Sequence, residues 1–428
     1  MLIFIPQNHQ CMIKSFFSLV IIICGQSIHS QIAQEVNPPG YIKSITFQGQ
    51  TRESQLPILQ LGQQLILEFD ALNGDEDDFY YKIEHFDYDW TPSQLMQTEF
   101  LSGIDNQRIR NYENSFNTYQ IYSHYTLRLP NSQTRGLKVS GNYMIKIFND
   151  LDELVFSRKF MVQENLANVG VSIKRSRDVR QVETMQSVDI VINSGNMQFN
   201  NPLQTVKTLI IQNNNLNTAI SNVAPQYTIG NELIYKYTKE TLFEGGNEYF
   251  YFENKDIRGA NAAIQYIELN ELYSNYLFTN VPRLNQPYTY NPDINGNFLI
   301  TAIDAEKPTI EADYAWIHFS LLLDELPANQ SVHVYGNFNN YAIDDFTKMT
   351  FNPNKGIYEV PIILKQGFYN YKYIIVNNQT GKINESAISG SYWQTENNYK
   401  VLVYYRDLGA RYDRIIGLGE GNSVNISN

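Results

Sequence analysis

Short stretches in which aromatic or aliphatic residues alternate with polar residues recur along the whole chain, separated by turn-forming residues. The densest is Tyr80–Pro130, which contains Y-Y-K-I-E-H-F-D-Y-D-W-T-P-S and later S-F-N-T-Y-Q-I-Y-S-H-Y-T-L-R-L-P. A period of two residues is typical of β-strands with one buried face, whereas an amphipathic helix needs a period near 3.6. Because helical periodicity is nearly absent, the sequence predicts an all-β protein made of several β-sandwiches.

The N-terminal segment 1–30 is predicted to be a signal peptide, with Met12 as an alternative start of translation. The apolar run Phe16–Cys24 suits a signal-peptide core and is too short to span a bilayer, and the mature chain would begin near Gln31. The two cysteines of the chain, Cys11 and Cys24, both fall in this segment. We therefore expect an exported chain without a thiol for a disulfide, a nucleophile or a metal site.

The charge balance is acidic, with 44 Asp and Glu against 32 Lys and Arg and a formal net charge of −12. An acidic surface repels nucleic acid and anionic lipid, so neither is expected as a partner. After the signal segment no apolar run reaches membrane length, and we expect a protein that does not span the membrane.

The length suits about three domains. The alternating segment Gly141–Phe148 resembles the closing hairpin of an immunoglobulin-like sandwich. Glu248–Phe252 is assigned to a second sandwich, and Tyr399–Tyr405 is expected to close a third. The segment from about residue 417 is expected to be a flexible tail because it is rich in Gly, Asn and Ser. The expected boundaries of the three consecutive immunoglobulin-like units are 31–165, 166–290 and 291–428.

No catalytic or metal-binding motif stands out. The G-x-S-x-G turn of hydrolases is absent. His85 and His124 could meet in the first unit, but a histidine in an aromatic strand is more often a hydrogen-bonded structural residue. Asp75–Asp78 follows Asn-Gly and is expected to form a solvated turn rather than a calcium site. Gly417–Gly421 lacks the following helix that a phosphate loop needs. We predict no enzyme activity, no cofactor and no metal.

The strand that contains Tyr88 is expected to continue to Trp90. Alternation would then point Asp87 and Asp89 outward and Phe86, Tyr88 and Trp90 inward. Trp90 is therefore predicted to be a core residue.

The stretch Tyr80–Pro130 closely resembles the first domain of the type IX secretion system plug proteins. The residues that carry the resemblance, with an implied structural role, are His85, Asp87, Asp89, Trp90, Pro92, Ser93, Asn117, Thr118, His124 and Tyr125. Family-like segments also occur at 288–296, 397–406 and 409–417.

The resemblance implies a periplasmic binding protein associated with the outer membrane. Its implied partner is the large outer-membrane translocon barrel of the type IX secretion system, which it would close between rounds of cargo export. We expect three sandwiches in a rigid rod; the residues that contact the barrel are not predicted.

The third unit resembles an early-set immunoglobulin-like module of the glycogen-binding type, through V-Y-G-N-F-N-N-Y and G-F-Y-N-Y-K-Y. Such modules stack sugar rings on exposed aromatic side chains, and Tyr341 and Trp393 are the candidates here. The alternative function is therefore a periplasmic glycan-binding accessory protein. The same aromatic side chains could instead fill the sandwich or an interface between units.

Overall fold

The computed structural model describes residues 32–49, 55–424 and 426, so the signal segment and both cysteines lie outside the described residues. The fold is all-β, as predicted. Its helices in this part of the chain are single turns: α2 (Gln97–Phe100), α3 (Pro202–Thr205), α4 (Pro308–Glu311) and the 3-10 turn η1 (Asn337–Asn339).

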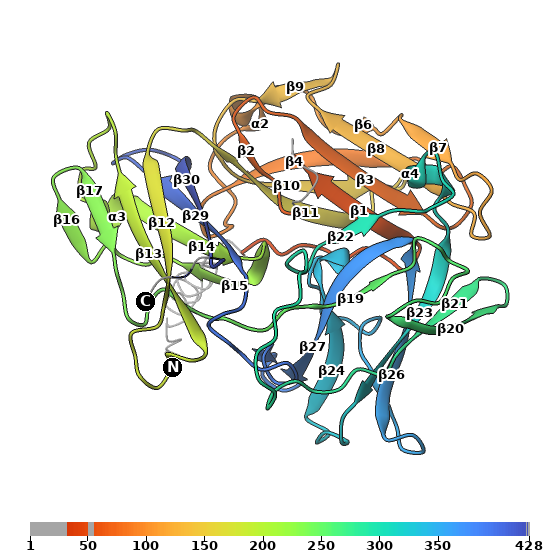
Figure 1. The fold of residues 1–428 in the computed structure, drawn as a ribbon. Helices are drawn as coiled ribbons and strands as arrows, with labels where there is room; N and C mark the ends of the chain where they lie inside the picture. The colour runs from red at the N-terminus through yellow and green to blue at the C-terminus, as the bar shows by residue number, and fades with distance from the viewer. Residues whose placement is uncertain (1–31, 50–54, 425, 427–428) are drawn as a thin grey trace, which may run out of the picture.

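The first unit is a sandwich of two sheets with an aromatic core (Figure 1). One sheet has the order β1-β3-β8-β7, with bounds Ile42–Gln48, Leu65–Ala71, Ser123–Leu129 and Tyr112–Asn114. The facing strands are β2 (Ile58–Gln60), β4 (Tyr80–Phe86), β6 (Gln107–Arg108), β10 (Gly141–Phe148) and β11 (Leu154–Gln163). A separate ribbon pairs β5 (Leu101–Gly103) with β9 (Thr134–Leu137).

The second unit packs a five-stranded sheet against strands from two distant parts of the chain. The five strands are β12 (Asn168–Arg175), β13 (Met185–Asn193), β16 (Tyr227–Ile229), β17 (Glu232–Tyr235) and β18 (Leu242–Glu244). The opposite layer has the order β15-β14-β29-β30, with bounds Asn215–Ser221, Val206–Gln212, Asn398–Tyr405 and Arg414–Asn422. A parallel bridge, Gln163 to Ile415, joins this layer to β11, so one sheet runs through two units.

The third unit is also a sandwich. One sheet comprises β19 (Phe250–Glu253), β22 (Phe298–Ile300), β24 (Gln330–Tyr335), β27 (Gly367–Asn377) and β28 (Ile383–Asn384). The other has the order β20-β21-β23-β26-β25, with bounds Ile264–Leu269, Tyr273–Leu277, Tyr314–Leu322, Ile357–Lys365 and Thr350–Asn352.

The predicted strand assignments need three corrections. The closing strand expected in the third unit, β29, pairs with β14 of the second unit, and Figure 1 shows β29 and β30 in dark blue beside β14. Conversely β19, expected in the second unit, pairs with β27 of the third. The strand that was to reach Trp90 ends at Phe86, and Asp87–Trp90 forms a turn. Alternation identifies a strand but not its neighbour; the unit boundaries at 165 and 290 stay a prediction.

The segment expected to be a flexible tail is instead the strand β30. Gly417, Gly419 and Gly421 lie on one of its faces, where β12 crosses it. A Cβ on Gly419 would lie 2.6 Å from Val169 Cγ1, and one on Gly417 would lie 2.8 Å from Ala167 O. The glycines therefore allow the two layers to approach closely, and their spacing of two residues is a strand signal.

Candidate functional site

The signature residues from His85 to Ser93 close a tight turn after β4. His85 Nδ1 lies 2.8 Å from Ser93 Oγ, and Ser93 N donates to His85 O (3.1 Å). The imidazole is buried beside the rings of Phe100 and Tyr143, and burial lowers the pKa of His85. Its other nitrogen, Nε2, lies 3.2 Å from Ser140 O. This histidine is therefore a buried, hydrogen-bonded structural group.

The turn itself attaches the first unit to the second. Asp87 Oδ2 forms an ion pair of 2.5 Å with Arg406 Nη2, and Arg406 also contacts Asp413 (3.1 Å). Tyr88 N donates to Asp413 Oδ2 (3.0 Å), and Asp413 N donates to Asp87 Oδ1 (3.2 Å). Asp89 remains local and accepts hydrogen bonds from the backbone and hydroxyl of the next-but-one residue. The carboxylate of Asp87, expected to face solvent, is thus part of a joint.

Trp90 is a buried residue, as predicted, with 9% of its surface exposed. It has a left-handed φ of 63°, and the neighbouring turn is closed by a bridge between Phe86 and Pro92. The apolar cluster around Trp90 draws on both units: Leu56, Phe86, Met144 and Met161 from the first, and Leu209, Ile211, Leu402, Tyr404 and Ile415 from the second. Trp90 therefore belongs to the joint between units rather than to the interior of the first sandwich.

The loop that contains the signature residues Asn117 and Thr118 attaches the first unit to the third. Asn117 has a left-handed φ of 58°, and Thr118 Oγ1 donates to Gln120 O (2.8 Å). This loop geometry directs Tyr119 N and Gln120 N at the carboxylate of Asp313, at 2.7 and 3.1 Å. Tyr122, just beyond the loop, donates its hydroxyl to the backbone of Ala312 (2.8 Å).

A charged cluster lies behind this loop, fully enclosed by the two units. Asp70 of β3 accepts hydrogen bonds of 2.6 Å from Lys365 of β26 and Tyr314 of β23, and lies 2.6 Å from Nδ1 of His124. Asp70 is 0% and Lys365 2% exposed. Burial alone would raise the pKa of Asp70, but Lys365 and His124 hold it below its ordinary value. Tyr125, next in the signature, stacks on Phe69 in the first core.

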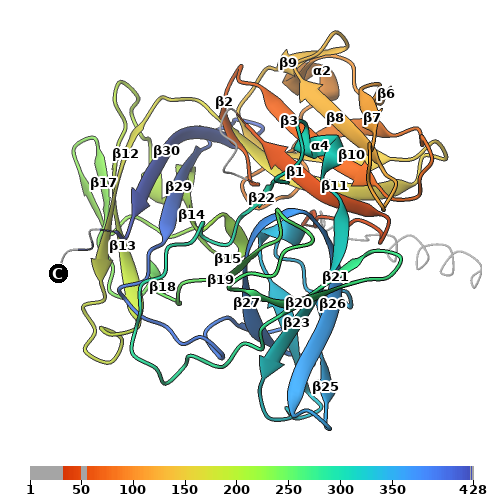
Figure 2. The ribbon, with the colours of Figure 1, turned by 45° about the vertical axis from the view of Figure 1, so that its right-hand side comes forward.

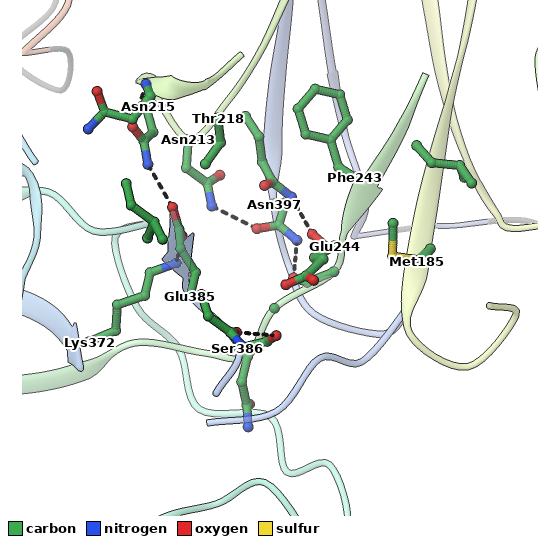
Figure 3. A pocket seen from close by; sticks show the side chains of 18 of the residues that line it. Met185, Asn213, Asn215, Thr218, Phe243, Glu244, Lys372, Glu385, Ser386 and Asn397 are labelled. Atoms are coloured by element: carbon green, nitrogen blue, oxygen red, sulfur yellow. Dashed lines mark hydrogen bonds and ion pairs between the residues drawn. The ribbon is translucent and has the colours of Figure 1, made fainter. Parts of the chain in front are cut away.

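A cleft of about 570 Å³ lies at the third joint, between the second and third units (Figure 3). Asn215 Nδ2 donates to Tyr335 Oη (3.0 Å) and Glu385 Oε1 (3.1 Å), and Glu385 is paired with Lys372 (2.5 Å). Many lining side chains are amides, including Gln212, Asn213, Asn215, Asn217, Asn247, Asn384 and Asn397. They suit neutral polar groups, but the lining aromatic residues, Phe243 and Tyr249, are buried and offer no open face for a sugar ring.

The two candidate sugar platforms are both engaged within the protein. Tyr341 is 2% exposed and donates to Asn213 O (3.1 Å), so it is not an exposed platform for a sugar ring. The ring of Trp393 is half-buried, with the guanidinium of Arg175 at 4.6 Å. Both aromatic residues contact the second unit from a segment expected in the third.

Asp87 and Trp90 thus lie at the joint with the second unit and His124 lies beside the joint with the third, whereas Tyr125 is in the core of the first sandwich. His85 and His124 have different partners. Sequence reasoning missed Asp70, Tyr314 and Lys365. Asp70 and Lys365 have the same strand parity as Glu68 and Glu359, so alternation gave no signal that they are buried. Across residues 32–49 and 55–424, no group of three or more His, Cys, Asp or Glu side chains could hold a metal ion. In the same part of the chain no helix has the length and apolar character needed to cross a membrane.

Residues 42–164 match the family described as type 9 secretion system plug protein, first domain. The range runs from the first residue of β1 to the residue after β11. The crystal structure of a hypothetical protein from Parabacteroides merdae ATCC 43184 is 32% identical, with a TM-score of 0.87 over 91% of this chain and 98% of that chain. A biofilm associated protein, BSP domain, reaches a TM-score of only 0.19 at 8% identity, covering 92% of this chain and 61% of that one, and carries no argument. The comparison with curated proteins gives no match.

Fold and joints define a class of protein: a chain of β-sandwiches whose distinctive residues hold the units together. Within that class, the chain belongs through its first domain to the type IX secretion system plug protein family, which supports its involvement in type IX secretion.

Proposed function

We propose that this protein is a non-enzymatic periplasmic plug, which closes the periplasmic opening of the large outer-membrane translocon barrel when no cargo passes. The observation that carries the proposal is the placement of the signature residues at the joints. Asp87 binds the first unit to the second, and Asp70 with His124 binds it to the third. A protein that blocks a pore must keep its units in a fixed arrangement. Buried ion pairs and hydrogen bonds at the joints between the units provide that rigidity.

The arrangement of the units supports the same proposal. Each unit contacts the other two, so the protein is a three-lobed body (Figure 2) rather than the rod expected from sequence. Such a body presents a broad cross-section whichever lobe faces the barrel. The export signal expected in the first 30 residues would deliver it to the periplasm, and the barrel would hold it at the outer membrane.

The test is a deletion strain in which the barrel is confirmed by immunoblot. We expect the outer membrane to admit large hydrophilic antibiotics that the parent excludes, while cargo export falls only in part, because loss of a stopper removes a barrier and not a reaction. Complementation with the full chain should restore exclusion, and the barrel should co-purify with the complementing protein. Parental permeability in the deletion strain, with the barrel present and no other partner on it, would contradict the proposal.

A further inference from the structure

A buried arginine stands in the core face of the first sandwich. Phe156 and Phe160 of β11 point between the sheets and are 0% exposed. Arg158 lies between them with the same parity and is 4% exposed. Arginine stays charged inside proteins, so the fold places a cation where β11 otherwise has core residues.

The guanidinium of Arg158 has few partners. Nη1 donates to the carbonyl of Ser157 (2.8 Å), and the group lies 5.6 Å from the ring centre of Phe156. No carboxylate of the described residues forms an ion pair with it. The two oxygens of Glu35 accept instead from Lys159 N (2.5 Å) and Asn340 Nδ2 (2.7 Å). Burial lowers the pKa of Arg158, and the charge of Glu35 opposes this without forming an ion pair. A buried cation without a counter-ion in contact is costly, and the guanidinium has five N–H donors to offer a ligand.

A cavity of about 80 Å³ gives access to this cation from the joint between the first and third units. It lies where β1 has a bulge between Lys43 and Thr46, and where Ser44 has a left-handed φ of 49°. Bulges of this kind redirect side chains and open a sheet locally. The walls are mostly apolar and come from both units, including Ile42, Ile45, Phe298, Phe338 and Leu364.

The lining holds one more cation and one acid. The Lys43 ammonium lies 5.0 Å from the ring centre of Phe346, which is 57% exposed, and burial lowers the pKa of Lys43. Asp344 Oδ1 accepts from the backbone of Phe346 (3.0 Å) and Thr347 (3.1 Å), so that oxygen already caps a turn.

We propose that this cavity binds a short aliphatic carboxylate, whose two oxygens meet the Arg158 fork while its hydrocarbon part fills the apolar walls. The planar guanidinium matches a carboxylate with two parallel hydrogen bonds. A strongly hydrated dianion such as sulfate would lose water against apolar walls without compensation. The ligand would touch both units and so strengthen their joint.

The test is calorimetric titration of the full mature chain with isovalerate, together with its thermal unfolding. We expect saturable binding and a melting temperature that rises with isovalerate, because a ligand of the folded state stabilises it. Isovaleramide, of similar shape without the charge, and sulfate should not bind. The carboxylate could come from a free small acid or from a polypeptide C-terminus, and N-acetyl-leucine distinguishes the two. Binding of N-acetyl-leucine but not of isovalerate assigns the pocket to a polypeptide C-terminus. Failure of both carboxylates to bind overturns the proposal.

Variants place the binding. Arg158→Met should weaken it on the order of tenfold or more, since a charge-assisted hydrogen bond is lost. Arg180→Met, at an arginine whose side chain is 83% exposed, is the matched control and should bind like wild type. Ala342→Phe should block the cavity and abolish binding while it keeps the arginine. This variant tests the proposal even if the Arg158→Met protein does not fold. Unchanged binding in a folded Arg158→Met or Ala342→Phe protein overturns the proposal.

Discussion

Replacing Asp70 by Asn should be among the most destabilising isosteric changes in this protein. Asp70 carries the carboxylate that forms the ion pair with Lys365, and both groups are almost completely buried. In the variant the ammonium keeps the carbonyl of Thr309 (2.7 Å) and the ring of Tyr122 (4.0 Å). Leaving a buried charge without its counter-ion costs about 3–5 kcal/mol, and we expect the free energy of unfolding to fall by that amount.

The reverse change should cost less. In Lys365→Met, Asp70 still has Tyr314 and His124 at 2.6 Å, so the carboxylate keeps two hydrogen-bond partners. The loss should be about 1.5–3 kcal/mol, the range for one hydrogen bond to a charged group. The double variant removes both charges and should be more stable than Asp70→Asn alone.

Urea unfolding at pH 7, followed by the fluorescence of the three tryptophans, measures all three variants. Thr46→Val, which removes a half-buried hydroxyl of β1 that donates to Glu68, is a control for loss of an ordinary hydrogen bond. The reasoning fails if Asp70→Asn stays within about 1 kcal/mol of wild type, the size of an ordinary hydrogen bond, or if the double variant loses the sum of both single losses.

Three further variants test other parts of the structure. Trp90→Ala should lower the free energy of unfolding by about 3–5 kcal/mol; an unchanged melting temperature with lost barrel binding would make Trp90 a partner contact instead. Burial raises the pKa of Glu248 to about 7 from an ordinary 4.5, so the folded state keeps a proton that the unfolded chain releases. Wild type should therefore lose stability relative to Glu248→Gln as pH rises from 4.5 to 7; a constant difference in melting temperature contradicts this. Gly419→Ala should cost about 1–3 kcal/mol by pushing β12 away, whereas Gly170→Ala, with its nearest atom at 3.7 Å, should not.

The sequence predicted those parts of the fold that depend on local alternation. In β23, Ile317 and Phe319 are buried while Trp316 and His318 lie on the other face, as their spacing indicates. The pairing of β29 with β14 could not be predicted in this way, because alternation reports which face is buried and not which strand lies alongside.

The site shows the same division between local and distant information. The resemblance found the turn and loop residues of the first unit, but not that they are joints. Asp70 and Lys365 are 295 residues apart, and each shares a strand face with a less buried Glu, so alternation alone predicts that both face solvent. The role of Asp70 becomes visible only when the fold places Lys365 beside it.

The burial of several signature residues also limits where the barrel of the proposed function can be contacted. His85, Trp90 and His124 are buried within this chain, so they are not available to a partner. A substitution there can abolish plugging by loosening the joints, and it would then lower the melting temperature as well. A substitution in a true contact surface would weaken barrel binding at an unchanged melting temperature. On the proposed function, the barrel interface is to be sought among exposed residues, which include Pro92 and Asn117 of the signature, and stability measured beside binding separates the two cases.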